Sequence, residues 1–78
     1  MKTKIKLIWQ FFGKDALKIA DHHLVHLHEY ILREEIHVLD EGSELINEFS
    51  SISFIIIDRS LVEKLRVALK PHKAFIVE

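Results

Sequence analysis

SISFIIID, from Ser51 to Asp58, is the most informative stretch of the sequence. Its β-branched and aromatic side chains favour a strand. Successive side chains of a strand point to opposite faces, and here both faces receive apolar residues: Ile52, Phe54 and Ile56 on one, Ile55 and Ile57 on the other. The face of an antiparallel sheet that carries no helices should be polar, so a strand with two apolar faces indicates either an interface on the outer face or a central position in the sheet.

The residues after this strand predict a helix and then a last strand. Ser60, with Glu63 three positions later, has the pattern of a capping box at a helix start. The apolar stripe of this helix consists of Leu61, Val62, Leu65 and Leu69. Pro71 is expected to end the helix, and AFIVE, from Ala74 to Glu78, predicts a final short strand.

The residues before the central strand give a weaker pattern. EIHVLD, from Glu35 to Asp40, predicts a short strand, and DEGS, from Asp40 to Ser43, predicts the turn that closes it. The segment from Glu44 to Phe49 fits either a single helical turn or a continuing strand, and the sequence leaves both open.

The first half of the chain contains one strand and one helix. KIKLIWQFF, from Lys4 to Phe12, alternates so that its odd-numbered residues form one apolar face. Gly13 ends this strand, and Asp15 is expected to cap the helix that follows. From Ala16 the apolar period is that of a helix, which is expected to end between Arg33 and Glu35. The apolar arc of this helix is Ala16, Leu17, Ala20, Leu24, Leu27 and Ile31.

The resulting order of elements, βαββαβ, resembles the ferredoxin-like split βαβ arrangement over the whole chain. This resemblance of pattern implies an α+β fold in which an antiparallel sheet carries two helices on one face. Because 78 residues fill only one core, residues 1–78 are expected to form a single domain. A fold of this kind hosts many functions, so it does not by itself assign one.

An apolar sheet face predicts self-association. The face without helices should be polar, yet Ile8, Phe12 and alternate residues between 74 and 77 add apolar surface to that of the central strand. A patch of this kind on a small domain marks an interface, and without cysteine no disulfide compensates for the small core. We therefore expect a homodimer joined through the apolar sheet face or an edge strand. The alternative is that lysine side chains cover the patch.

Four of the six histidines lie in DHHLVHLHEY, from Asp21 to Tyr30. At the helical period, His22, His26 and Glu29 share the face opposite the apolar arc. Imidazoles one turn apart can share a divalent cation, and a carboxylate can add an oxygen. These three residues are therefore a candidate site for Zn, Ni or Cu. The alternative is a solvated helix face, because basic residues on the same line repel a cation.

His23 and His28 flank the apolar arc, near the seam between the first helix and the sheet. A histidine in such a seam can act as an acid or a base, but catalysis also needs a nucleophile or oxyanion donors at the same point. The sequence has no G-x-S-x-G motif and no cysteine. We therefore assign no catalytic residue and expect a non-enzymatic binding or assembly module.

The sequence also bears on ligands and location. Gly13 and Lys14 are candidates for binding a small anion at the helix N-terminus, although every such loop needs a turn residue. The net charge of −1 argues against nucleic acid, and the basic cluster from Lys70 to Lys73 also fits a helix C-terminus. No stretch approaches the roughly 20 apolar residues that cross a bilayer, and no secretion signal is evident. A cytoplasmic location is expected.

Overall fold

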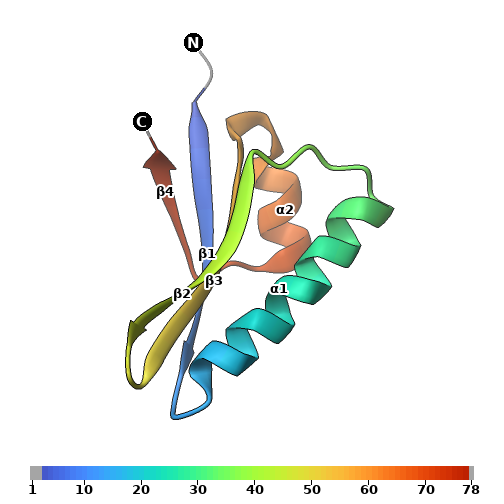
Figure 1. The fold of residues 1–78 in the computed structure, drawn as a ribbon. Coiled ribbons are helices and arrows are strands. Elements are labelled where there is room, and N and C mark those ends of the chain that lie inside the picture. The colour runs from blue at the N-terminus through green and yellow to red at the C-terminus, as the bar shows by residue number, and fades with distance from the viewer. Residues whose placement is uncertain (1–2, 78) are drawn as a thin grey trace.

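The chain forms an α+β fold in which a four-stranded antiparallel sheet carries both helices on one face (Figure 1). The computed structural model describes residues 3–77. The elements in chain order are β1 (Lys4–Phe12), α1 (Ala16–Arg33), β2 (Asp40–Asn47), β3 (Ser50–Asp58), a 3-10 turn (Arg59–Leu61), α2 (Val62–Leu69) and β4 (Lys73–Val77). The strands lie in the order β2-β3-β1-β4, so β1 and β3 are central and β2 and β4 are the edges.

The elements with strong periodicity lie where the sequence predicted them. β1 has the predicted bounds, α1 ends at Arg33, and β3 begins one residue before the predicted start. Asp15 precedes α1 as expected, but its side chain makes no capping hydrogen bond. β4 begins at Lys73, and Glu78, the predicted end of this strand, lies outside the described residues.

The main hydrophobic core lies between the sheet and the two helices. Its buried residues are Ile5, Leu7 and Trp9 of β1, Leu27 and Ile31 of α1, Ile55 and Ile57 of β3, and Leu65 of α2. Trp9 also joins the two layers, because its Nε1–H donates a 2.8 Å hydrogen bond to the carbonyl oxygen of Leu69 at the end of α2. The odd-numbered residues of the two central strands thus hold both helices on one face.

A second, smaller cluster occupies the opposite face of the sheet, which we call the open face. Its members are Ile8, Ile52 and Phe54, with Ile56 packed against them. The first three are each 9% exposed or less. The Lys6 ammonium lies 4.2 Å from the centre of the Phe54 ring, and the same Nζ is 3.8 Å from Oε1 of Glu44. The predicted apolar face is therefore present, but its centre is already covered within one chain.

The second strand lies further along the chain than the sequence indicated. Residues 35–39 contain no strand, and β2 runs through the segment DEGS that we interpreted as a turn. Gly42 lies within this strand, where a Cβ would meet the Phe54 ring at 3.0 Å. Glycine serves here for a close approach between strands rather than for a turn. As an edge strand, β2 also carries charges that a central strand would exclude, and it continues as far as Asn47.

The start of α2 also differs from the prediction. The 3-10 turn comes first, and Asp58 caps it by accepting hydrogen bonds from the Ser60 backbone N–H at 3.0 Å and the Ser60 hydroxyl at 2.6 Å. Glu63 pairs instead with Arg66, one turn later, at 3.0 Å. The predicted capping box between Ser60 and Glu63 is therefore wrong. The cap is built instead two residues earlier by the carboxylate of Asp58, which the sequence pattern placed at the end of the strand.

Candidate functional site

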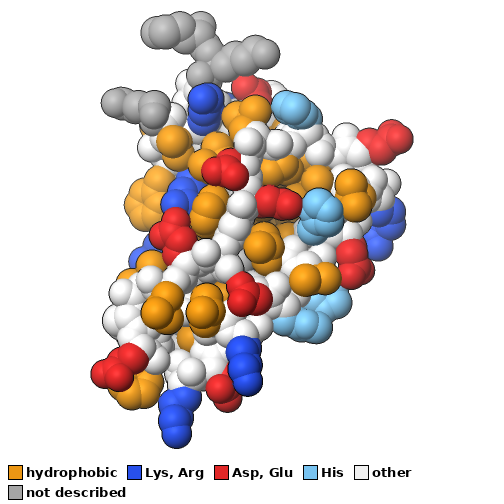
Figure 2. All heavy atoms as spheres, in the orientation of Figure 1, with side chains coloured by type: hydrophobic (Ala, Val, Ile, Leu, Met, Phe, Trp, Pro, Cys, Tyr) orange, Lys and Arg blue, Asp and Glu red, His pale blue; other side chains and the backbone are white. Residues whose placement is uncertain are grey.

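α1 directs its four histidines to different surroundings. His22 and His26 are exposed on the side away from the sheet. His23 lies in the seam between α1 and the sheet, and His28 faces β2, where its Nδ1 is 2.8 Å from Oε1 of Glu41. Figure 2 shows imidazole side chains spread along the helix side of the molecule. The predicted division into an outer face and a seam is confirmed.

His22 and His26 form the closest pair of imidazoles. Their Nε2 atoms are 3.0 Å apart, and their rings meet edge to face at 84°. Glu29, the third residue of the predicted metal site, does not complete a cluster with them. Within residues 3–77, no group of three or more His, Cys, Asp or Glu side chains is placed to hold a metal ion. The three-ligand site stays a prediction, and the structure provides two adjacent nitrogen donors.

His23 is the most enclosed histidine of α1. Its Nδ1 lies 2.7 Å from Oγ of Ser53, and its ring centre is 5.3 Å from those of both Trp9 and Phe11. Ser53 is fully buried, with an exposed fraction of 0%. A substrate therefore has no access to this hydroxyl, and the contact gives a buried polar group its hydrogen-bond partner.

His72, in the loop between α2 and β4, belongs to the same region, although the sequence placed it only in the basic cluster from Lys70 to Lys73 and predicted none of its contacts. Its backbone N–H donates to the carbonyl oxygen of Ile8 at 2.9 Å, and its Nδ1 accepts from the Gln10 N–H at 2.8 Å. The side chain thus extends the β1–β4 ladder beyond its last backbone pair. Its ring centre lies 6.5 Å from that of Phe11. Only the register between these two distant strands brings His72 here, and nothing in the local sequence sets that register.

Gly13 and Lys14 follow β1 directly, as predicted. The Gly13 N–H donates a 2.8 Å hydrogen bond to the carbonyl oxygen of Phe49, and its φ of 115° is one that glycine adopts readily. This bond ties the start of α1 to the β2–β3 hairpin. It also occupies one of the donors that the anion hypothesis requires, and anion binding at Gly13 and Lys14 stays a prediction.

Exposed apolar side chains gather at two other places. The first is the tip of the β2–β3 hairpin with the end of β1, where Phe12, Leu45, Ile46 and Phe49 are 51–71% exposed. Figure 2 shows hydrophobic side chains over this end of the molecule. The second is β4, where Phe75 is 52% and Ile76 is 70% exposed. Neither group belongs to the two buried clusters.

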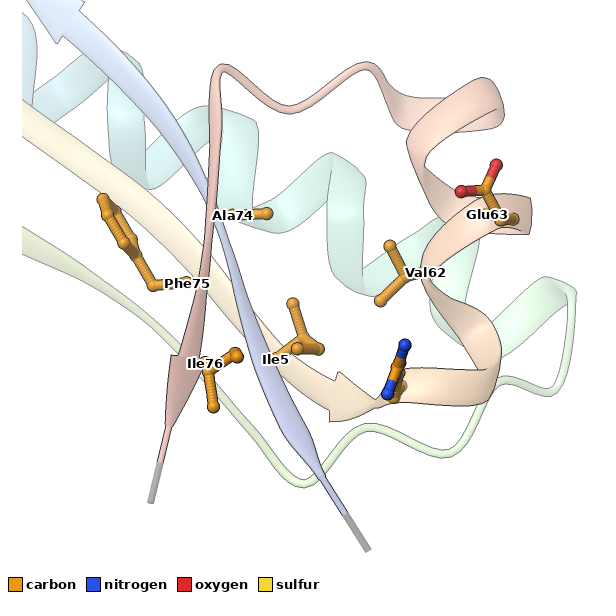
Figure 3. Close-up of a pocket in the computed structure, with 7 residues that line it drawn as sticks. Ile5, Val62, Glu63, Ala74, Phe75 and Ile76 are labelled. Carbon is orange, nitrogen blue, oxygen red and sulfur yellow. The ribbon is translucent and has the colours of Figure 1, made fainter.

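A groove of about 330 Å³ lies between β4 and α2. It is lined by Ile5, Arg59, Val62, Glu63, Ala74, Phe75 and Ile76. In Figure 3, Val62 of α2 and Ala74 of β4 lie on opposite sides of this groove, while the ring of Phe75 points away from it. Five of its seven lining residues, Ile5, Val62, Ala74, Phe75 and Ile76, are apolar.

His23 is expected to make the stability of the fold depend on pH. Its pKa is lowered from the ordinary value of 6.5, first by burial and then by the nearby His26 and His72. The unfolded chain therefore takes up this proton at a higher pH than the folded chain. Well above pH 6.5, His23 is neutral in both states and does not change the free energy of unfolding. As the pH drops below that value, the unfolded chain is protonated first and the stability of the fold decreases. The loss is complete once the pH lies below the folded pKa.

The measurement is the melting temperature between about pH 7.5 and 5.5 for the wild type and for His23→Asn, whose amide can still bond to Ser53. The decrease on acidification is expected to be smaller in His23→Asn. His37→Asn, in the exposed segment before β2, is the control and should retain the wild-type decrease. An equal decrease in the wild type and in His23→Asn would show that His23 does not contribute.

Comparison of the chain with models of known protein families, with curated proteins and with solved structures found no match in any of the three. Among the described residues, neither helix combines the length and the apolar character needed to cross a membrane. The cytoplasmic location and the absence of nucleic-acid binding stay predictions.

Proposed function

We propose that the protein is a small binding and assembly module that pairs with a second copy of itself through β4. The observation that carries this proposal is an edge strand with exposed apolar side chains on both faces, Phe75 on the open face and Ile76 on the helix face. Within residues 3–77, no strand pairs with the outer edge of β4. An unprotected edge of this kind is a template for a further strand.

The other candidate surfaces support self-association less well. The β2 edge has exposed apolar residues in Leu45 and Ile46, but it also carries Asp40, Glu41 and Glu44, and the acidic side chains of two such edges would repel each other. The centre of the open face, where the apolar patch was expected to join two copies, is covered by Lys6 lying over Phe54. β4 has the sequence KAFIV and therefore only one charge.

A second copy fits β4 because the strand is complementary to itself. Two antiparallel β4 strands related by a twofold axis at Phe75 would place Ala74 of one copy opposite Ile76 of the other. A small residue would then face a large one on the helix side, next to the groove beside α2. The two Phe75 rings would meet on the open face, where an aromatic pair adds to the buried apolar area. A closed contact of this kind is the commonest form of homodimer.

The test is the mass of the untagged chain in solution, measured by native mass spectrometry and by light scattering across a concentration series. The wild type is expected to form dimers at high concentration, and Ile76→Asp is expected to remain monomeric. Val67→Asp on α2 is the matched control, because Val67 and Ile76 are both 70% exposed. A monomeric wild type at the highest concentration, or an Ile76→Asp variant that dimerises as well as the wild type, would overturn the proposal.

We also propose that the fold is of the ferredoxin-like type. The support is the βαββαβ order of elements, in which each of the two central strands is followed by a helix and the two helices share one face. In this arrangement β1 lies between β3 and β4, and both of its pairings are antiparallel. A solved structure of the chain and its superposition on proteins of this fold would test the assignment.

A further inference from the structure

The pair formed by His22 and His26 is a second feature, and it is independent of β4. The two residues are one helical turn apart on α1, and their ring centres are 4.6 Å apart. Both side chains are exposed, so a cation between them can keep several water ligands. Their two Nε2 nitrogens lie 3.0 Å apart, close enough for both to bind one metal ion.

This spacing matches two neighbouring ligands of one transition-metal ion. Imidazole nitrogens bind such ions at about 2.1 Å. Two nitrogens in adjacent positions of a square-planar or octahedral ion then lie about 3.0 Å apart, whereas two in a tetrahedral site lie about 3.4 Å apart. In the metal-free chain the 3.0 Å separation is that of a hydrogen bond, and it shows that the two nitrogens can approach as closely as two ligands of one ion. Ni²⁺ and Cu²⁺ are ions that imidazole donors suit.

We propose that His22 and His26 together chelate one Ni²⁺ or Cu²⁺ ion per chain through their Nε2 atoms, with water in the remaining positions. Without metal, the short separation requires one ring to donate an Nε2–H hydrogen bond and the other to accept it. With metal, both rings present Nε2 lone pairs and carry their protons on Nδ1. For the lone pairs to converge on one ion, both exposed rings have to turn away from the line that joins the two nitrogens, which their broad outer torsion angles allow.

The charges near the pair limit its affinity without excluding the ion. Lys18 lies one turn before His22 on the same face of α1 and repels a cation through solvent. Arg33, two turns beyond His26, is 3.6 Å from a carboxylate oxygen of Glu34, which offsets part of its charge. The helix offsets part of this repulsion. Its backbone already holds the two imidazoles one turn apart, so less conformational entropy is lost when they bind an ion.

The test is isothermal titration of the untagged protein with NiCl₂ at neutral pH in buffer without chelator. One Ni²⁺ per chain is expected. His22→Ala and His26→Ala should each weaken the affinity at least about tenfold, because the second imidazole of a chelating pair binds as an intramolecular ligand. His28→Ala is the matched control on the same helix. Its ring faces Glu41, and its removal should change the affinity less than about twofold.

A second readout separates binding from folding. Ni²⁺ is expected to raise the melting temperature of the wild type and of His28→Ala, because the ion binds the folded helix. The same addition should raise the melting temperature of His22→Ala and His26→Ala by less, because they bind the ion more weakly, and far-UV circular dichroism is expected to show both variants folded. Equal affinity in the wild type and either single variant, or the same loss in His28→Ala, would overturn the proposal. The result is independent of whether the chain dimerises through β4.

Discussion

Replacement of Trp9 by alanine is expected to lower the free energy of unfolding by about 3–5 kcal/mol. Trp9 is 3% exposed and lies in the core between the sheet and both helices. Alanine removes the buried indole and leaves a cavity, and it also removes the hydrogen bond to the carbonyl of Leu69. A chain of 78 residues has a total stability of about 4–12 kcal/mol. The variant should therefore be close to its folding threshold at ordinary temperature.

Trp9→Phe is the matched control, because it keeps an aromatic ring in the same place and loses mainly the Nε1–H hydrogen bond. Its expected cost is about 1–2 kcal/mol. Since Trp9 is the only tryptophan of the chain, unfolding is followed by far-UV circular dichroism in urea rather than by fluorescence. If Trp9→Ala unfolds at the same urea concentration as the wild type, then Trp9 is not part of the core described above.

Replacement of Gly42 by valine is expected to cost about 1–3 kcal/mol through overpacking. A Cβ at position 42 would lie 3.0 Å from Cζ and 3.1 Å from Cε1 of Phe54. The ring has to move away from β2, and it then loses its contact with the Lys6 ammonium. The apolar centre of the open face becomes more exposed, so the variant should also bind a hydrophobic dye more strongly than the wild type does.

A double variant tests the cause of this effect. Phe54→Leu is destabilising by itself, but it removes the ring that valine would strike. Gly42→Val with Phe54→Leu should therefore be more stable than the sum of the two single changes predicts, by about 0.5–3 kcal/mol. Simple additivity in urea unfolding would mean that Gly42 and Phe54 do not meet. The cost at position 42 would then come from glycine's backbone rather than from the ring.

The elements that can be predicted from the sequence are those with one buried face, because burial of one face spaces their apolar residues regularly. β1 alternates because one face meets the helices, and α1 repeats at the helical period because Ala20, Leu27 and Ile31 are buried. β2 gives no such signal, because its two faces carry a glycine and several acidic residues. The Gly42 that favoured a turn is instead required by Phe54, which lies twelve residues later in the sequence and opposite it in the sheet.

Some features of the candidate site could likewise be predicted from the sequence, and others could not. Helical geometry alone predicts that His22 and His26 share a face and that His23 lies in the seam, because both follow from positions within one element. The contacts of His72 with Ile8 and Gln10, and the bond between Gly13 and Phe49, join residues far apart in the chain. Their presence depends on strand register and loop path, which a single sequence does not fix.

The difference between the two sheet edges sets a limit on assembly. If two copies join at β4, the combined sheet has eight strands and ends on each side in β2. Each of these ends carries Asp40, Glu41 and Glu44, and like charges oppose the addition of a third copy. His28 and Lys6 lie near Glu41 and Glu44 and offset part of this charge, so the acidic edge would disfavour growth beyond two chains. The acidic strand β2, part of which the sequence suggested was a turn, would therefore favour a closed dimer over an open-ended fibre.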